Sequence, residues 1–374
     1  MTWRQEERGA TALIVVMFTI LLLMTISVGF VRLVVKDQGR TTDDELSRGA
    51  YDSAMAGVED GKRVLQACLG NGDATACAAM GDACNTIRRA KILSATAPVT
   101  TDEVRLRTDI TASGDSFDQA YTCVKIDRNT DDYKGSLKAD TTQIVRLDTT
   151  APFTQISVSW FLSAKAVGAI DLPMLATGTL PTADDWPLSR PPMLRVQLMQ
   201  YKNGDFRLSD FDEGGSTESG SSTLYLNPSE TGDTSLNFGS DDRRNSANNL
   251  VRPVVCDKTG FSTYACRVSI TLPNPIGGSS SDRRAYLRLV SIYGDTDFMI
   301  QPVGTQLRDV QPAIDSTGRA NNVFRRVQAR VEMTNGLDAQ LYPRATVDIT
   351  KNFCKDFSVS NTDFFAGSCD YTQP

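Results

Sequence analysis

The segment that decides the fold is Ala10–Val31, ATALIVVMFTILLLMTISVGFV, which runs for 22 residues without a formal charge. An α-helix of this length is roughly 33 Å long, enough to cross a hydrocarbon core of about 30 Å. A secretory signal peptide normally has a shorter apolar region, of about 7 to 15 residues, followed by small residues. This run is longer and meets Arg32 and Lys36 instead. We therefore expect an uncleaved membrane-spanning helix over residues 10–36.

The flanking charges and the cysteines give opposite indications of how this helix is oriented. Basic residues lie on both sides of it, with Arg4 and Arg8 before and Arg32, Lys36 and Arg40 after. By the positive-inside rule this count would place the rest of the chain in the cytoplasm. However, all eight cysteines follow the helix, and an even set of this kind indicates disulfides in an oxidising compartment. Large domains translocate largely regardless of flanking charge, so we expect a single-pass inner-membrane protein with its C-terminal part outside.

The helix is predicted to continue over residues 37–69, because Asp43–Leu69 contains no proline and keeps a helical apolar period. The stripe consists of Tyr51, Ala54, Val58, Gly61, Leu65 and Cys68. Such a seam packs along another surface, and two surfaces remain open: the chain's own domain, or neighbouring subunits. In the second case Leu13, Ile14, Val15, Tyr51, Ala54, Val58 and Leu65 would form an assembly helix.

Residues 70–126 are predicted to form a polar insert containing Cys77, Cys84 and Cys123, preceded by Cys68 at the helix end. Four cysteines allow three pairings, and the spacing does not choose among them. We expect Cys68 to tie the helix to the insert. A zinc site is disfavoured because the paired short spacings of zinc knuckles are absent.

Residues 127–374 are predicted to form a β-rich domain, because from about residue 140 the apolar period changes from helical to two, which is typical of half-buried antiparallel strands. Strands are expected near residues 142–147, 156–162, 194–198, 223–226, 265–272, 284–293, 298–303, 327–333 and 345–350. The chain is thus predicted to be α+β: a long N-terminal helix, membrane-spanning and then amphipathic, followed by a large antiparallel β-rich extracytoplasmic domain with disulfides.

Two further cysteine pairs are local within this domain. Cys256 and Cys266 flank a possible hairpin, and Cys354 and Cys369 would close a C-terminal loop. Closing a loop of about 15 residues stabilises the fold by on the order of 3 kcal/mol in the chain-entropy model.

The composition excludes several function classes. The chain has no histidine, which rules out imidazole catalysis and histidine-ligated zinc, and its net charge of -6 argues against nucleic acid as a partner. Phosphate-binding loops, dinucleotide fingerprints and G-x-S-x-G elbows are absent. We expect no enzyme and no cofactor; an extracytoplasmic enzyme with paired carboxylates is a third class, but no pair is singled out.

Two weaker site signals have plain structural interpretations. Asp127, Asn129 and Asp131 have the opening spacing of a calcium loop, but the sixth position lacks Gly and the twelfth is Lys138 where a Glu is needed. We interpret them as a solvated turn, and we expect no metal site. Trp160, Trp186, Tyr201 and Phe206 could line a ligand groove, although aromatic residues on strands are more often core.

The N-terminal 60 residues resemble type IV pilins. The resemblance rests on a short polar leader ending at Gly9, the apolar run from Ala10, Arg32 and the small-residue helix Ala50–Lys62. Among pilins the chain is most similar to the PilX-type minor pilins. The resemblance implies that residues 1–9 are a leader, that a prepilin peptidase cuts between Gly9 and Ala10, and that the helix later packs inside a filament. Residues 315–326 and the loop closed by Cys354 and Cys369 are weakly similar to pilins as well.

The chain departs from the pilin pattern at the fifth mature position. Most pilins carry Glu there, which pairs with the terminal amine of the neighbouring subunit, whereas this chain has Ile14. The PilX-type proteins and the K-type minor pseudopilins lack the same carboxylate, and the resemblance places them at or near a filament tip. A minor, priming or tip-located subunit is therefore expected.

The expected partners are other pilins, the pilus assembly machinery, prepilin peptidase and the cytoplasmic membrane, and the expected location is the inner membrane and then the pilus surface. The alternative is an adhesin-like, permanently anchored β-domain that binds a glycan or a protein. Prepilin peptidase separates the two, because a permanent anchor should be indifferent to it.

Overall fold

The computed structural model describes residues 7–92, 99–100, 103–106, 118–168, 170, 182–202, 220–238, 251–257, 263–277 and 283–332. The expected strand at 345–350, Phe206, Cys354 and Cys369 lie outside these residues. The fold is α+β, with one long apolar N-terminal helix followed by β-rich structure, as the sequence predicts.

The chain divides into two compact units. Unit 1 comprises Met1–Ile126 and Ile314–Ala329, and unit 2 comprises Asp127–Ala313 and Arg330–Pro374. The chain passes between them within three strands: β3 (Gln119–Thr130), β14 (Leu307–Ala320) and β15 (Val323–Arg330). The first of these crossings lies at residue 126, where the sequence predicts a boundary. Residues 314–329, which were expected in the β-rich domain, belong instead to unit 1, together with the long helix.

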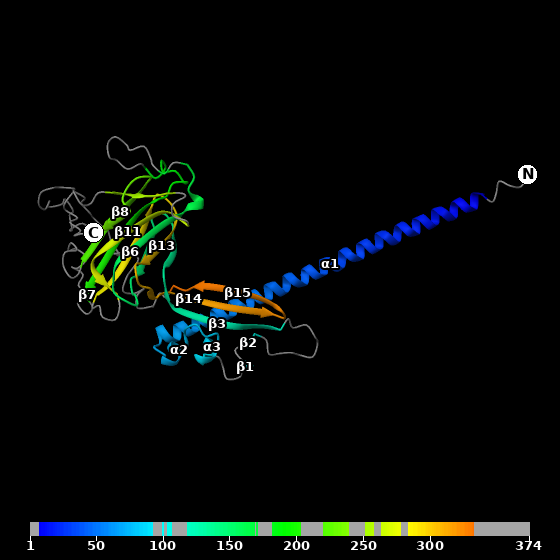
Figure 1. The fold of residues 1–374 in the computed structure, drawn as a ribbon, viewed down its shortest axis with the longest axis horizontal. Helices are drawn as coiled ribbons and strands as arrows, with labels where there is room; N and C mark the ends of the chain where they lie inside the picture. Colours follow the sequence, from blue (N-terminus) through cyan, green and yellow to red (C-terminus); the bar gives the residue numbers. More distant parts are fainter. Residues whose placement is uncertain are drawn as a thin grey trace, which may run out of the picture. The chain divides into compact units, whose positions relative to one another are not determined.

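Unit 1 is built on the helix α1 (Glu7–Leu65), which has 59 residues and is continued by the π-helical turn η1 (Gln66–Gly70). The predicted membrane and amphipathic segments therefore form a single rod of about 90 Å. The C-terminal part of the rod packs on the sheet β1-β2-β3-β14-β15, while its N-terminal part extends away from that sheet (Figure 1). The two short strands of this sheet are β1 (Val99–Thr100) and β2 (Glu103–Arg105).

The helix lies unusually close to β14. A Cβ added at Gly318 would lie 2.2 Å from the backbone nitrogen of Ala54 and 2.3 Å from the carbonyl oxygen of Ala50. On the helix side, a Cβ added at Gly61 would lie 2.8 Å from the Ile314 side chain. Small residues on both elements are therefore what allow helix and sheet to pack together.

Two disulfides fix the insert of unit 1. The disulfide Cys68–Cys77 ties η1 to the helix α2 (Ala74–Ala79). The disulfide Cys84–Cys123 ties the segment just before the helix α3 (Thr86–Arg89) to β3. The expectation that Cys68 ties the helix end to the insert is confirmed. The 39-residue separation of the second pair stabilises the fold by about 4 kcal/mol in the chain-entropy model. With both pairs oxidised, these cysteines offer no thiolates to a metal.

The described residues of unit 2 form two five-stranded sheets that share one hydrophobic core. The first has the order β10-β8-β7-β12-β5 and the second the order β4-β13-β6-β11-β9. Most strand pairs are antiparallel, but β10 pairs parallel with β8 and β9 pairs parallel with β11. The strands of the first sheet are β10 (Arg252–Val255), β8 (Gly220–Ser229), β7 (Met193–Lys202), β12 (Arg283–Ile292) and β5 (Thr142–Arg146). Those of the second are β4 (Tyr133–Leu137), β13 (Thr296–Pro302), β6 (Phe153–Leu162), β11 (Tyr264–Ile276) and β9 (Ser235–Asn237).

Alternation of side chains explains the two-layer arrangement of unit 2. Ile156, Val158 and Trp160 of β6 are fully buried, and the intervening Ser157 and Ser159 lie on the other side of the sheet. Each predicted strand that falls within the described residues is present. The expected pair Cys256–Cys266 is confirmed, and it joins the end of β10 to β11. We did not predict β3 and β14 from the sequence, nor β4 and the short strands β1, β2, β9 and β10.

Replacing Gly318 by Ala tests the close approach of helix and strand. The added methyl group meets backbone rather than a flexible side chain, so the free energy of unfolding should fall by about 1–3 kcal/mol. Thermal unfolding of the detergent-solubilised chain, followed by circular dichroism, measures this change. Gly39→Ala is the control: a Cβ there meets nothing within 4 Å, and its better helix propensity should leave stability equal or slightly higher. Equal unfolding midpoints for the two variants would contradict the packing described above.

Candidate assembly surface

The N-terminal half of α1 is an apolar surface with no cover in the described part of the chain. Every residue from 12 to 45 is exposed, including large side chains such as Leu13, Ile14 and Val15 at 63%, 53% and 60%. By length and composition this helix could cross a membrane, and none of its most apolar stretch is buried. Because water-exposed apolar area costs roughly 25 cal/mol per Å², the surface requires lipid or other protein around it.

Gly9 and Ala10, the expected cleavage pair, lie in the first turns of α1. Ile14 follows one turn later and is half exposed on the same uncovered surface. The five positions from Ala10 to Ile14 contain no carboxylate or other charge.

The C-terminal half of α1 is different, because its small-residue face is covered by the chain itself. Ala54, Val58 and Leu65 are fully buried in unit 1, so they are not open to a neighbouring subunit. Tyr51, from the same predicted stripe, is 50% exposed. Of the two packing surfaces left open by the sequence, the chain's own domain is the one occupied along this face.

A buried polar contact anchors the helix to β3. The Tyr121 hydroxyl donates a hydrogen bond of 2.6 Å to Oδ2 of Asp60, and Arg63 forms an ion pair of 2.7 Å with Oδ1. Burial, and then the hydrogen bond and charge of Asp60, raise the pKa of Tyr121 well above its usual value. Both carboxylate oxygens of a nearly buried acid are thus satisfied, which a lone buried carboxylate requires.

We did not identify Asp60 and Tyr121 from the sequence. The sequence does contain one indication of Asp60, because this acidic residue stands next to Gly61 in the predicted stripe of small residues. A charge at such a position indicates a polar partner in the fold, but the partner lies 61 residues away.

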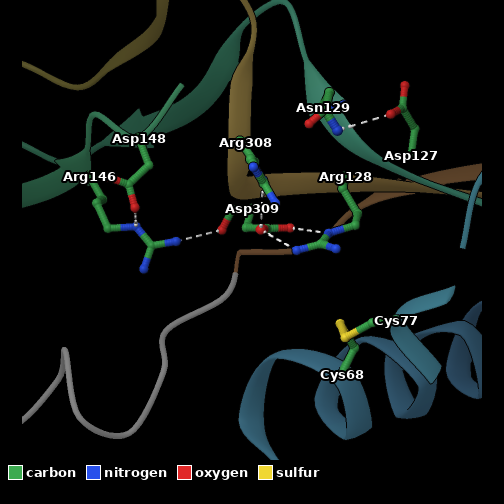
Figure 2. A network of polar contacts seen from close by, with 9 residues as sticks. All are labelled: Cys68, Cys77, Asp127, Arg128, Asn129, Arg146, Asp148, Arg308 and Asp309. Atoms are coloured by element: carbon green, nitrogen blue, oxygen red, sulfur yellow. Dashed lines mark hydrogen bonds and ion pairs between the residues drawn. A yellow bond between two sulfur atoms is a disulfide. The ribbon is translucent and has the colours of Figure 1, made fainter. Parts of the chain in front are cut away.

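Unit 2 contains a second polar network, centred on Asp309 (Figure 2). Arg128 donates to both carboxylate oxygens of Asp309, at 2.6 and 2.5 Å, and Arg146 donates to the Asp309 carbonyl oxygen at 3.0 Å. Asp148 pairs in turn with Arg146 at 3.0 Å. Asp309 has a φ of 57°, a conformation that Asp tolerates better than most residues. The network holds this irregular residue of β14 in place, and its engaged carboxylate is a poor candidate for acid-base chemistry.

The calcium candidates do not converge on a common point. Asp127 accepts a hydrogen bond from the backbone nitrogen of Asn129 at 2.9 Å, and Asp131 accepts one from Gln306 at 2.9 Å (Figure 2 shows the first of these contacts). No group of three or more Asp, Glu, Cys or His side chains suited to a metal occurs among the described residues. Asp127 and Asn129 lie in β3 rather than in a free loop.

The aromatic candidates are parts of the core rather than of an open groove. Trp160 is fully buried and donates from its indole nitrogen to the Pro192 carbonyl oxygen at 2.9 Å. Trp186 is stacked on Tyr293, with ring centroids 4.3 Å apart, and Arg190 lies over its ring. The side chain of Tyr201 and the whole of Phe206 lie outside the described set.

A groove of about 630 Å³ crosses the outer face of the second sheet of unit 2. Its floor is a row of polar residues in register across four strands, Gln301, Ser157, Ser269 and Ser235. Arg267 donates to the Ser157 hydroxyl at 3.2 Å and is the charged residue of the lining. The groove has no nucleophile–base pair, and it is suited to hydrogen bonding rather than to catalysis.

Replacing Tyr121 by Phe tests the polar anchor. The variant should lose about 1–3 kcal/mol of stability at neutral pH, because Asp60 loses a buried donor. The pKa of Tyr121 is higher in the folded state than in the unfolded chain, so above pH ~10 the unfolded chain loses this proton while the folded state keeps it. The stability that the hydrogen bond contributes is therefore fully present below pH ~10 and decreases as the pH rises above it. Denaturant unfolding across this range should therefore show the gap between wild type and variant narrowing above pH ~10. A gap independent of pH would contradict the anchor, and the exposed Tyr51→Phe, which should change stability by less than about 0.5 kcal/mol, is the control.

Comparison of the chain with protein-family models, with curated proteins and with solved structures found no match. Its function is therefore inferred from its residues and their arrangement.

Proposed function

We propose that this chain is a minor, priming or tip-located subunit of a type IV pilus or a related filament, and that it acts by association rather than by catalysis. The observation that carries the proposal is the division of α1 into two halves. One half is apolar and uncovered, while the other is anchored to a sheet of the same chain by close packing and the Asp60–Tyr121 hydrogen bond. A rod built in this way can move between environments without unfolding the domain that it carries.

The uncovered half suits lipid and helix–helix packing equally well, since both remove apolar side chains from water. In the proposed sequence of events the helix first holds the chain in the cytoplasmic membrane, with the remainder outside. Prepilin peptidase then removes residues 1–9, and residues from Ala10 onward pack among the helices of other pilins. The three disulfides of the described chain are compatible with an oxidising compartment outside that membrane.

The minor role follows from Ile14. A subunit without a carboxylate at this position cannot pair with the terminal amine of a neighbour in an apolar setting, where an unpaired amine is costly. Such a subunit suits a filament end, where that neighbour is absent. The two units of the chain also make it large for a regular fibre surface.

Mass spectrometry of the membrane-extracted protein tests the cleavage. In cells with active prepilin peptidase the N-terminal peptide should begin at Ala10, whereas in a peptidase deletion it should retain residues 1–9. Gly9→Val is the matched variant, because a β-branched side chain replaces the glycine of the scissile bond and should block cleavage. An uncleaved N-terminus in peptidase-positive cells, or function unchanged by the deletion, would favour the permanently anchored, adhesin-like alternative.

A pair of helix substitutions separates assembly from folding. Tyr51→Ala removes an exposed aromatic side chain and should leave thermal stability unchanged, yet lower incorporation into filaments by roughly tenfold, as expected for loss of an interface aromatic residue. Leu65→Ala removes a fully buried side chain of the same helix and should cost about 2–5 kcal/mol of stability. Quantitative immunoblotting of sheared filaments measures incorporation. If Tyr51→Ala filaments contained normal amounts of the subunit, Tyr51 would not lie in an assembly contact.

A further inference from the structure

The outer face of the sheet β10-β8-β7-β12-β5 is basic and contains no acidic residue among its described, paired positions. Leu194, Val196 and Leu198 of β7 point into the core of unit 2, so the alternate residues Arg195 and Gln197 lie on the opposite face. Strand pairing extends this face in rows. One row comprises Thr142, Val290, Arg195 and Tyr225, and the next comprises Ile144, Arg288, Gln197 and Thr223.

Arg195 and Arg288 are diagonal neighbours on adjacent strands of this face. Arg195 is opposite Val290, and Arg288, two residues earlier on β12, is opposite Gln197. Diagonal positions of an antiparallel pair lie about 7–8 Å apart, within reach of two long side chains. Burial, and then the charge of Arg195, hold the pKa of Arg288 below its usual value.

Neither guanidinium has a carboxylate partner among the described residues. Arg195 lies over the ring of Tyr225, 5.8 Å from its centroid, and its buried Nε has no hydrogen-bond acceptor there. Arg288 donates a long hydrogen bond of 3.4 Å to the Thr142 hydroxyl. Other arginines of the same unit are ion-paired, such as Arg128 with Asp309 and Arg252 with Asp233. Two partly buried like charges that no described carboxylate neutralises oppose folding, and a bound anion would relieve that cost.

The surroundings indicate what kind of anion would fit. The aromatic ring of Tyr225 and the neutral hydrogen-bonding side chains of Gln197 and Thr223 lie in the same two rows of this face as the arginines. Such groups suit sugar hydroxyls. Planar guanidinium groups match carboxylate and sulfate oxygens well.

We propose that Arg195 and Arg288 form a binding site on unit 2 for the carboxylate or sulfate groups of an acidic polysaccharide. The site is independent of the assembly helix, so it can be tested whether or not the chain enters a filament.

The test uses the full chain in detergent and measures binding to immobilised polygalacturonate, dextran sulfate, neutral dextran and duplex DNA. Wild type should bind the two acidic glycans and not the neutral dextran, with binding weakening as salt is raised. Arg195→Gln and Arg288→Gln should each lower affinity by roughly tenfold, the usual cost of one charge-assisted hydrogen bond. The control is Arg267→Gln, which makes the same charge change on the outer face of the other sheet and should change affinity by less than about twofold.

The result that would overturn the proposal is acidic-glycan binding that is equal in wild type and the double variant, or lowered as much by Arg267→Gln. Tighter binding of DNA than of both glycans at the same salt, lost in the double variant, would assign the pair to nucleic acid and would overturn it as well. The double variant should unfold at the same temperature as wild type or higher, because a like-charge pair is removed. If it proves unstable, Arg288→Gln alone carries the test, with the same tenfold loss expected.

Discussion

The close packing of one helix face against one strand is the interaction on which unit 1 depends. Gly318 of β14 lies so near the backbone at Ala50 and Ala54 that no side chain fits between them. This approach buries the small residues of α1, and with them the Asp60 carboxylate, which needs the Tyr121 hydroxyl and Arg63 as partners. Anchoring one half of the helix in this way leaves the other half to extend as an uncovered apolar surface.

Because of this packing, the two halves of α1 have different environments. A long apolar helix by itself would serve as an anchor, a core helix or an assembly element, and composition does not distinguish among these. No described part of the chain covers the apolar half, which is exposed from residue 12 to residue 45, so this half is not a core helix of the described fold. The filament proposal and the anchor alternative differ only in whether this surface leaves the lipid, which is a question of processing at Gly9.

Polar groups in unit 2 follow two different patterns. Around Asp309, arginines and a carboxylate neutralise one another and hold an irregular strand residue in place. On the outer face of the neighbouring sheet, Arg195 and Arg288 lie together without a carboxylate among the described residues. Stability explains the first arrangement. It does not explain the second, since unpaired like charges oppose folding, and this contrast is the reason to look for an anionic ligand there.

The sequence by itself determined the long helix, the change to strand periodicity near residue 140 and the local pair Cys256–Cys266, because each is encoded in residues close together along the chain. The tertiary structure decided which partners distant segments take: β14 with β3, Tyr121 with Asp60, and Cys84 with Cys123. It also decided that the stripe around Ala54 and Val58 faces the chain's own sheet. A periodic pattern specifies that a face is buried but not what buries it, since that choice depends on contacts between residues far apart in sequence.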